Sequence, residues 1–235
     1  MKKIILFGVL LILMTALVSC NKIAFDDDGV FEFYPTGDGY FVTVRDPEYI
    51  KHMEEIEIPY LYKFKPVVGI EEKAFSGCSN LKRLTIPSGV ETIGDYAFSG
   101  CESLTSITIP GSVTSIGGYA FYHCTSLTSI TIPDSVTSIG EAAFADCNGL
   151  TSITVPFVGA TKDGTGNTHF GYIFGAPSYS YNDYCVPSSL RSVVITGGKS
   201  IGNFAFSGCE SLTSVTIPDR ATLPSLHPQN NYCTL

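Results

Sequence analysis

A 23-residue repeat occupies residues 93–156, which read IGDYAFSGCESLTSITIPGSVTS, then IGGYAFYHCTSLTSITIPDSVTS, then IGEAAFADCNGLTSITVP. The three copies begin at Ile93, Ile116 and Ile139. A fixed period of this length indicates one supersecondary unit stacked on copies of itself. The rest of the chain is therefore an entrance to this array, an interruption of it, or its end.

Each copy contains the spacing L-x-x-I-x-I-P, as at Leu104, Ile107, Ile109 and Pro110. The two isoleucines lie on one face of a strand because side chains alternate along it. Proline has no N–H to donate and ends the strand. A single coil cannot bury these side chains, whereas stacked coils bury them in columns. The pattern predicts a β-rich solenoid with a parallel sheet on one side and short turns or 3-10 segments on the other.

The array extends beyond the regular copies. Residues 53–59 match the strand segment in register, and residues 70–92 and 201–219 form further copies. The period breaks after Pro156, and we interpret residues 157–189 as one coil with expanded loops. The predicted array therefore spans residues 53–219.

The repeated pattern AF-x-x-C-x-x-L-x-x-I-x-I-P-x-x-V-x-x-I-G resembles the BspA-like (Treponema-type) class of leucine-rich repeats. The resemblance covers about residues 53–219 and implies a curved, right-handed solenoid on a surface-exposed bacterial protein. Several members of the class are adhesins that bind host matrix proteins or other bacteria.

Residues 1–19 have the form of a secretory signal, with Lys2 and Lys3 before an apolar stretch too short for a confident membrane span. The run Leu17-Val18-Ser19-Cys20 resembles the lipobox of bacterial lipoproteins and predicts acylation of Cys20. An ordinary signal peptide is the alternative. We expect an exported protein anchored by lipid, with Asn21 favouring the outer membrane or cell surface.

Three further segments flank the array. Residues 20–29 form an acylated linker, whose Asp26, Asp27 and Asp28 supply no defined calcium cage. Residues 30–52 alternate aromatic and branched residues around a small, acidic turn, which predicts a β-hairpin that caps the first coil. Residues 220–235 form an irregular tail, which either caps the last coil or marks a shortened array.

The composition excludes several functions. The net charge is -8 and only 15% of residues are charged, which argues against binding nucleic acid. No polybasic stripe favours anionic lipid, so membrane contact is expected through the lipid anchor only. The sequence contains no phosphate loop and no H-E-x-x-H, so we expect neither an enzyme nor a cofactor. His123, beside a column cysteine, is interpreted as a loop-exposed variant rather than a catalytic base.

Five cysteines occupy one column of the repeat. A linear column without C-x-x-C spacing is a poor zinc site, so we expect no metal. We interpret these residues as small buried hydrophobes whose S–H groups meet backbone carbonyls. Cys185 and Cys233 lie off the column and could pair if the tail folds back. The column consists of Cys78, Cys101, Cys124, Cys147 and Cys209.

Two surfaces are candidates for binding. Hydroxyl side chains between the inward residues form ladders, which either reflect the strand preference of Thr or bind a ligand. Tyrosines of the expanded coil either recognise a ligand or plug a gap between coils. The favoured partner is an extracellular protein, bound in adhesion; a glycan-binding module and a structural antigen without a ligand are the alternatives. The candidate residues are Ser106, Thr108, Ser129, Thr131, Ser152, Thr154, Tyr172, Tyr179, Tyr181 and Tyr184.

Overall fold

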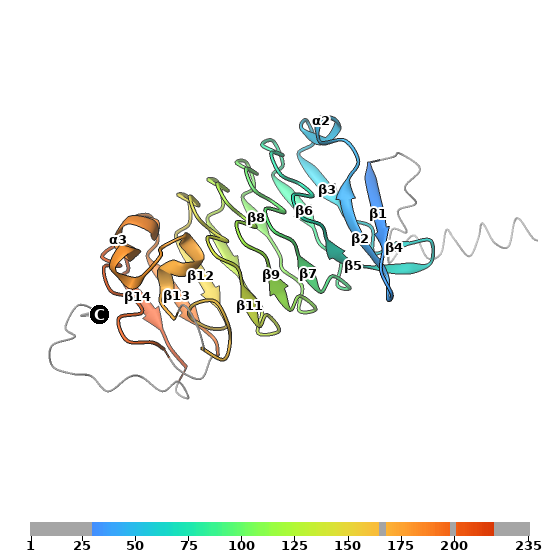
Figure 1. Cartoon of the computed structure of the whole chain (residues 1–235). Coiled ribbons are helices and arrows are strands. Elements are labelled where there is room, and N and C mark those ends of the chain that lie inside the picture. Colours follow the sequence, from blue (N-terminus) through green and yellow to red (C-terminus); the bar gives the residue numbers. More distant parts are fainter. Residues whose placement is uncertain (1–29, 165–167, 198–200, 219–235) are drawn as a thin grey trace, which may run out of the picture.

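The computed structural model describes residues 30–164, 168–197 and 201–218. Successive coils stack along one axis into an elongated array, with a hairpin at its N-terminal end and short helices near its C-terminal end (Figure 1). The β-rich leucine-rich-repeat solenoid predicted from the period is confirmed.

The L-x-x-I-x-I segments form the first strip of parallel strands. β3, β6 and β8 pair in one sheet, β10, β12, β13 and β14 pair in another, and β8 lies beside β10. Every pairing in this strip is parallel and joins equivalent residues of successive coils, for example Ile130 with Ile153. The strands are β3 (Glu55–Glu57), β6 (Arg83–Thr85), β8 (Ser106–Ile107), β10 (Ser129–Thr131), β12 (Ser152–Val155), β13 (Ser192–Ile195) and β14 (Ser214–Thr216).

A second strip of parallel strands runs where turns or 3-10 segments were expected. It is built by the T-S-I segment before each repeated glycine, so Ile93 pairs with Ile116 and Ile116 with Ile139. The expectation of a single parallel sheet is therefore incomplete. The strands are β5 (Lys65–Ile70), β7 (Thr92–Ile93), β9 (Ser115–Ile116) and β11 (Ser138–Ile139).

The predicted N-terminal hairpin continues this second strip. β1 (Phe31–Pro35) pairs antiparallel with β2 (Tyr40–Val44), and β2 pairs parallel with β5. Phe31 packs edge-on against Phe75 of the first full coil, with ring centroids 6.5 Å apart. The short helix α2 (Pro47–Ile50) follows, capped by the Asp46 carboxylate, and leads into β3. The hairpin therefore covers the open end of the first coil.

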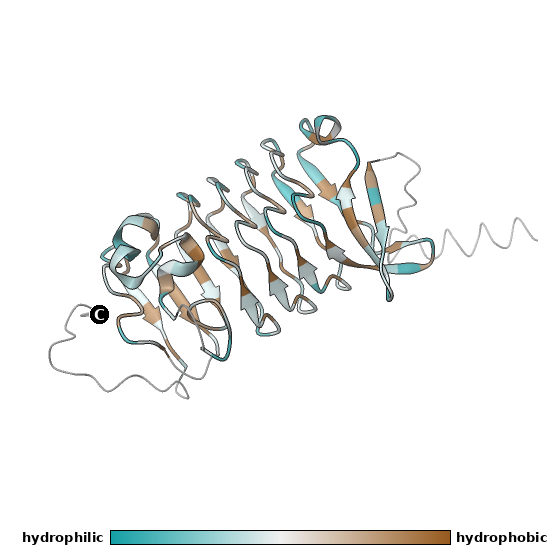
Figure 2. Ribbon diagram, viewed as in Figure 1, coloured by the Kyte–Doolittle hydropathy of each residue, from teal (hydrophilic) through white to brown (hydrophobic). Residues whose placement is uncertain are grey.

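The core consists of columns of equivalent side chains, and Figure 2 shows hydrophobic positions recurring from coil to coil. The Phe75, Phe98, Phe121 and Phe144 rings stack in order with centroids 5.2–5.4 Å apart. Each of these four rings is fully buried. Burial of one such side chain contributes roughly 1.5–3 kcal/mol, so each added coil supplies its own share of stability.

Three of the five column cysteines donate to backbone carbonyls of the preceding coil, as predicted for the column. The Sγ atoms of Cys101, Cys124 and Cys147 lie 3.3, 3.2 and 3.1 Å from the carbonyl oxygens of Phe75, Phe98 and Phe121. Burial raises the pKa of the Cys147 thiol to about 12. These thiols are therefore protonated donors within the core rather than nucleophiles.

Two turn positions in each coil adopt left-handed backbone conformations. One holds Gly77, Gly100, His123, Asp146 and Gly208, with φ between 58° and 78°. His123 therefore occupies a turn position whose positive φ favours glycine. The other position holds Lys73, Tyr96, Tyr119, Ala142 and Phe204, with φ between 55° and 59°.

The interrupted coil is rebuilt by short helices. η1 (Phe170–Phe174) takes the place of the repeated Ala-Phe segment, because the Phe144 N–H donates to the Ile173 carbonyl and the Phe170 N–H to the Ala205 carbonyl. The Phe174 ring lies 6.5 Å from Phe144 and the Phe170 ring 4.9 Å from Phe206, both between centroids. η2 (Tyr179–Tyr181) and α3 (Asn182–Cys185) follow it.

Candidate binding face

The outer positions of the first strip form two parallel ladders, which together we call the hydroxyl face. Strand pairing aligns Ser129, Ser152, Ser192 and Ser214 in one ladder. It aligns Thr131, Thr154, Val194 and Thr216 in the other, so Val194 interrupts the hydroxyls. Ser106 and Thr108 precede them in β8 and just after it, and both are exposed.

Hydroxyls elsewhere in the repeat bond one coil to the next. The Thr151 Oγ1 donates to the Thr128 carbonyl at 3.0 Å, and the Thr137 Oγ1 to the Thr114 carbonyl at 3.1 Å. The Ser135 Oγ similarly donates to the Val113 carbonyl at 2.7 Å. These serines and threonines stabilise the stack.

The hydroxyl face differs in this respect. Among the described residues, the side-chain hydroxyls of its ladders have no hydrogen-bond partner in the protein. Serine and threonine hydroxyls each provide a donor and two acceptor lone pairs. The face therefore presents unused donors and acceptors, spaced about 4.7–4.9 Å from strand to strand. The predicted site residues on this face are Ser106, Thr108, Ser129, Thr131, Ser152 and Thr154.

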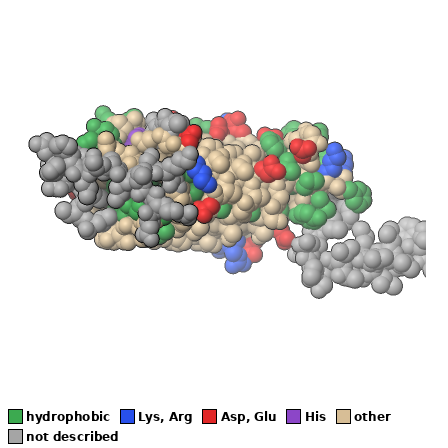
Figure 3. All heavy atoms as spheres, turned by 90° about the horizontal axis from the view of Figure 1, so that it is seen from below, with side chains coloured by type: hydrophobic (Ala, Val, Ile, Leu, Met, Phe, Trp, Pro, Cys, Tyr) green, Lys and Arg blue, Asp and Glu red, His purple; other side chains and the backbone are tan. Residues whose placement is uncertain are grey.

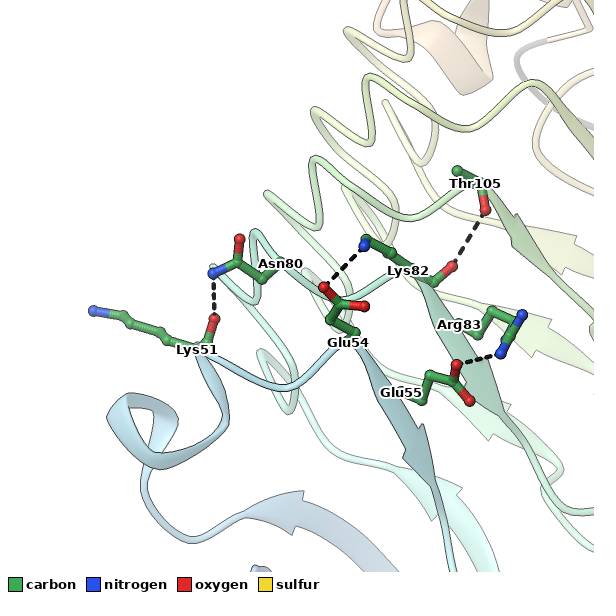
Figure 4. Close-up of polar contacts among 7 residues, drawn as sticks. All are labelled: Lys51, Glu54, Glu55, Asn80, Lys82, Arg83 and Thr105. Atoms are coloured by element: carbon green, nitrogen blue, oxygen red, sulfur yellow. Dashed lines mark hydrogen bonds and ion pairs between the residues drawn. The ribbon is translucent and has the colours of Figure 1, made fainter.

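The N-terminal end of this strip is charged. Glu54 pairs with Lys82 at 2.8 Å, and Glu55 pairs with Arg83 on the next strand (Figure 4). Thr105, beside them, already shows the coil-to-coil bond, 3.4 Å to the Lys82 carbonyl. Exposed ion pairs of this kind contribute little stability, but they give this end of the face a polarity that the later strands lack. In a view from below, much of the middle of the array is free of charged side chains (Figure 3).

The four candidate tyrosines do not form one group. Tyr172 is half-buried against the core, edge-on to His169. Tyr179, Tyr181 and Tyr184 are exposed, at 43%, 50% and 81% of their surface. Tyr179 stacks on Phe204 with centroids 5.0 Å apart, and Tyr181 lies 6.3 Å from Tyr184. The exposed tyrosines and Phe204 therefore make two ring pairs, which together we call the aromatic cluster.

Asn182, which the sequence did not single out, holds the interrupted coil together. Its side chain is fully buried, accepts from the Gly171 N–H and donates to the Ala205 carbonyl, both at 3.1 Å. His169 is buried beside it, and burial lowers the pKa of its imidazole. Neither ring nitrogen of His169 has a hydrogen-bond partner within the described ranges.

The described residues contain no group of three or more His, Cys, Asp or Glu side chains placed to hold a metal ion. In the same part of the chain, no helix has the length and hydropathy to cross a membrane. Cys185 has no disulfide partner there, and Cys233 lies outside it. The signal segment 1–19, Cys20 with the linker 20–29, and the tail 220–235 also lie outside the described residues.

The fold is similar to that of several solved leucine-rich repeat proteins. A leucine-rich repeat protein of T. pallidum superposes with a TM-score of 0.61 at 25% identity, covering 83% of each chain. A leucine-rich cell surface protein of Faecalibacterium prausnitzii superposes with a TM-score of 0.54 at 26% identity, covering 82% of this chain and 56% of that one. The pneumococcal vaccine antigen PcpA, at 19% identity and a TM-score of 0.51, shares the fold.

No curated protein matches the chain significantly. The family profile described as the BspA type leucine-rich repeat region matches six copies, over residues 49–162 and 179–226. These copies follow the coils described above and cover well over half of the sequence. The chain therefore belongs to the family of BspA-type leucine-rich repeat proteins.

Proposed function

We propose that this chain is a surface lipoprotein, acylated at Cys20, whose hydroxyl face binds a protein ligand in adhesion. Leucine-rich repeat proteins generally bind proteins, and members of this family are typically bacterial surface proteins and generally non-enzymatic scaffolds. The neighbour from Faecalibacterium prausnitzii, itself described as a cell surface protein, supports this location.

One observation carries the choice of surface. Repeated hydroxyls that serve the fold are bonded between coils, whereas those of the hydroxyl face are unused in the described structure. Thr suits an exposed strand in any case, which explains its presence but not the regular serine ladder beside it. An uncharged, hydroxyl-rich surface suits a protein ligand that makes many hydrogen bonds of moderate strength.

The test introduces charge on the hydroxyl face. The double variant Thr108→Lys, Thr131→Lys should lose binding to the immobilised matrix or bacterial surface protein that the wild type binds, by at least about tenfold, because each lysine desolvates poorly in an uncharged interface. Its melting temperature should stay close to that of the wild type because both side chains are exposed.

The matched control is Ser88→Lys, Asn148→Lys, which adds the same charge at two exposed positions outside the hydroxyl face. Equal ligand binding by both variants would show that the hydroxyl face is not the binding surface. Mass spectrometry of the membrane fraction tests acylation of Cys20 separately, with Cys20→Ala as the unmodified reference.

The aromatic cluster supports a second candidate, a glycan site. Exposed tyrosines give flat contact area with a polar tip, which suits sugar rings. Removal of the whole expanded loop is not a clean test, because Phe170, Ile173 and Phe174 belong to the core. The triple variant Tyr179→Ser, Tyr181→Ser, Tyr184→Ser leaves these residues in place. Loss of a glycan-array signal in this variant alone would favour this candidate, and binding by neither surface would favour a structural antigen.

A further inference from the structure

A tight hairpin at the N-terminal end of the array presents an exposed phenylalanine. β4 (Leu61–Tyr62) pairs antiparallel with the start of β5, leaving Lys63 and Phe64 as a two-residue loop. Both loop residues have positive φ, 47° and 64°. Loops of this kind are normally filled by Asn-Gly, because other side chains are strained there. Phe64 nevertheless occupies this position and is 92% exposed.

The lysines around Phe64 are also unusual. Every other described Lys or Arg has a carboxylate or carbonyl partner, for example Lys73 with Glu72 at 2.6 Å and Lys162 with the Asp134 carbonyl at 2.7 Å. Among the described residues, Lys63 and Lys65 have none, although the protein as a whole is acidic. Lys63 instead contacts the Tyr62 ring, and its Nζ lies 5.0 Å from the ring centroid. The loop therefore combines an exposed apolar ring with two cations that have no carboxylate or carbonyl partner among the described residues.

The position of this loop relates it to the start of the chain. It lies beside β1 and β2 at the end of the array farthest from the C-terminal helices (Figure 1). The Tyr62 ring stacks on Phe33 of β1, with centroids 4.0 Å apart, which fixes the loop to the first described strand. Nine residues separate Cys20 from Val30, and an extended chain over these ten residue-to-residue steps reaches roughly 35 Å. An acyl chain on Cys20 would thus keep this loop within reach of the membrane surface.

We propose that Lys63, Phe64 and Lys65 form a membrane-contact tip, which inserts Phe64 into the interface of an anionic bilayer while the two lysines meet lipid phosphates. The tip is small, whereas a stable protein interface buries about 800 Å² on each partner. A membrane surface requires only an apolar side chain with adjacent cations, and each lysine near anionic lipid adds to the attraction.

This contact goes beyond the lipid anchor expected from the sequence. Two lysines are too few to hold a protein on a membrane by themselves, but acyl anchoring becomes stable when a second signal acts with it. The tip is that second signal, so the inference rests on the acylation of Cys20 in the proposed function. It also fixes an orientation, with the hairpin end at the membrane and the repeats extending away from it.

The protein contains no tryptophan, so Phe64→Trp introduces a single fluorescent reporter at the tip. The full chain carrying this substitution is reconstituted in phosphatidylcholine vesicles with 30% phosphatidylglycerol, some containing brominated lipid. Tryptophan emission at position 64 should shift to the blue and be quenched by the brominated lipid. The control is Tyr184→Trp, which places the reporter at an 81% exposed site at the opposite end of the array.

Two further variants keep the test independent of folding. Lys63→Gln, Lys65→Gln should lower the ratio of docked to undocked tip about fivefold for each lysine, whereas Lys73→Gln, Lys82→Gln, with the same change of charge, should leave it unchanged. Lys63→Asn, Phe64→Gly relieves the strained loop, so it should melt at a higher temperature than the wild type.

Absence of quenching at position 64, equal quenching at position 184, or equal quenching in vesicles of phosphatidylcholine alone would each overturn the proposal. Mass spectrometry of the same sample separates the two hypotheses. An acylated protein with an unquenched tip refutes the membrane contact alone. A protein without acyl chains refutes the anchor and, with it, the tip as a second membrane signal.

Discussion

At the scale of single residues, the stack of coils depends on close backbone contacts. A Cβ atom added to Gly117 would lie 2.5 Å from the Asp95 backbone nitrogen, and one added to Gly140 would lie 2.2 Å from that of Gly118. Real Cβ atoms do not approach backbone so closely. The repeated glycine after each Ile is therefore required by the neighbouring coil, rather than by its own turn.

Gly117→Ala should accordingly lower the free energy of unfolding by about 1–3 kcal/mol, as other forced overpacking does. The measurement is urea denaturation followed by circular dichroism. Gly111→Ala is the control, because a Cβ atom there meets nothing within 4 Å. Similar stability in the two variants would contradict the close-approach argument.

His169 should make stability depend on pH. Burial lowers the pKa of this imidazole, so the folded protein holds it neutral while the unfolded chain takes up a proton near pH 6.5. The stabilising contribution is complete above about pH 6.5 and is lost as the pH falls toward the lowered folded-state value.

The measurement compares the unfolding free energies of the wild type and His169→Phe at pH 7.5 and pH 5.5. The wild type should lose more stability than the variant on acidification, with His123→Gln, at a surface site, behaving like the wild type. An equal loss of stability in the wild type and His169→Phe would show that His169 does not cause the pH dependence.

At the scale of elements, the interrupted coil depends on one buried side chain. The Asn182 amide joins η1, through the Gly171 N–H, to the last coil, through the Ala205 carbonyl. Asn182→Ala leaves the Gly171 N–H buried without a partner and removes one of the two donors to the Ala205 carbonyl, which the Phe170 N–H still bonds. It should lower the free energy of unfolding by about 1–3 kcal/mol.

Thermal unfolding monitored by calorimetry is the check for this variant. Asn80→Ala is the matched control: it also removes an amide hydrogen bond, to the Lys51 carbonyl at 2.7 Å, but at an exposed site where water replaces it. If the two variants lost the same small amount, Asn182 would have no special part in the coil.

The elements also differ in how far the sequence reveals them. The columns of Leu, Ile, Phe and Cys could be predicted because their period is explicit and each residue type matches its burial. The strands of the second strip could not, because two-residue strands such as β9 are too short to show alternation. Asn182 and His169 were missed because their roles depend on tertiary neighbours within an irregular segment. His123 could be interpreted from the sequence as a loop variant, because Gly and Asp recur at its position and both tolerate left-handed backbone.

The candidate site, likewise, could be predicted from the sequence only in part. The period predicts that Ser129 and Thr131 lie on an outer face, and the structure places them there. Which hydroxyls are already bonded between coils depends on side-chain distances that the period does not contain. The exposed tip at Phe64 lies outside the repeated pattern. Its left-handed backbone could not be predicted, because neither Lys nor Phe is typical of positive φ.

At the scale of the whole molecule, each coil contacts mainly its two neighbours, so stability should change in steps of one repeat. Deletion of residues 116–138 removes one period and joins Ser115 to Ile139, which is again the start of a coil. We expect a folded protein with a lower melting temperature and a smaller denaturant m-value, because less surface is buried.

Deletion of residues 116–137 is the control, since it removes one residue fewer and shifts every later column by one position. That chain should lose cooperative unfolding in the same denaturation experiment. If both deletions unfolded alike, the 23-residue register would not be what holds the array together.

The serine and threonine ladders have one more consequence. Successive rungs are chemically alike, so a ligand that fits Ser106 and Thr108 fits Ser129 and Thr131 equally well one strand further on. Such a surface behaves as a set of overlapping, equivalent registers, and its affinity includes a statistical gain that grows with the number of rungs. In the proposed adhesion, we expect a bound partner to shift from one register to the next without leaving the protein. Under a pulling force, an attachment of this kind yields by sliding before it detaches.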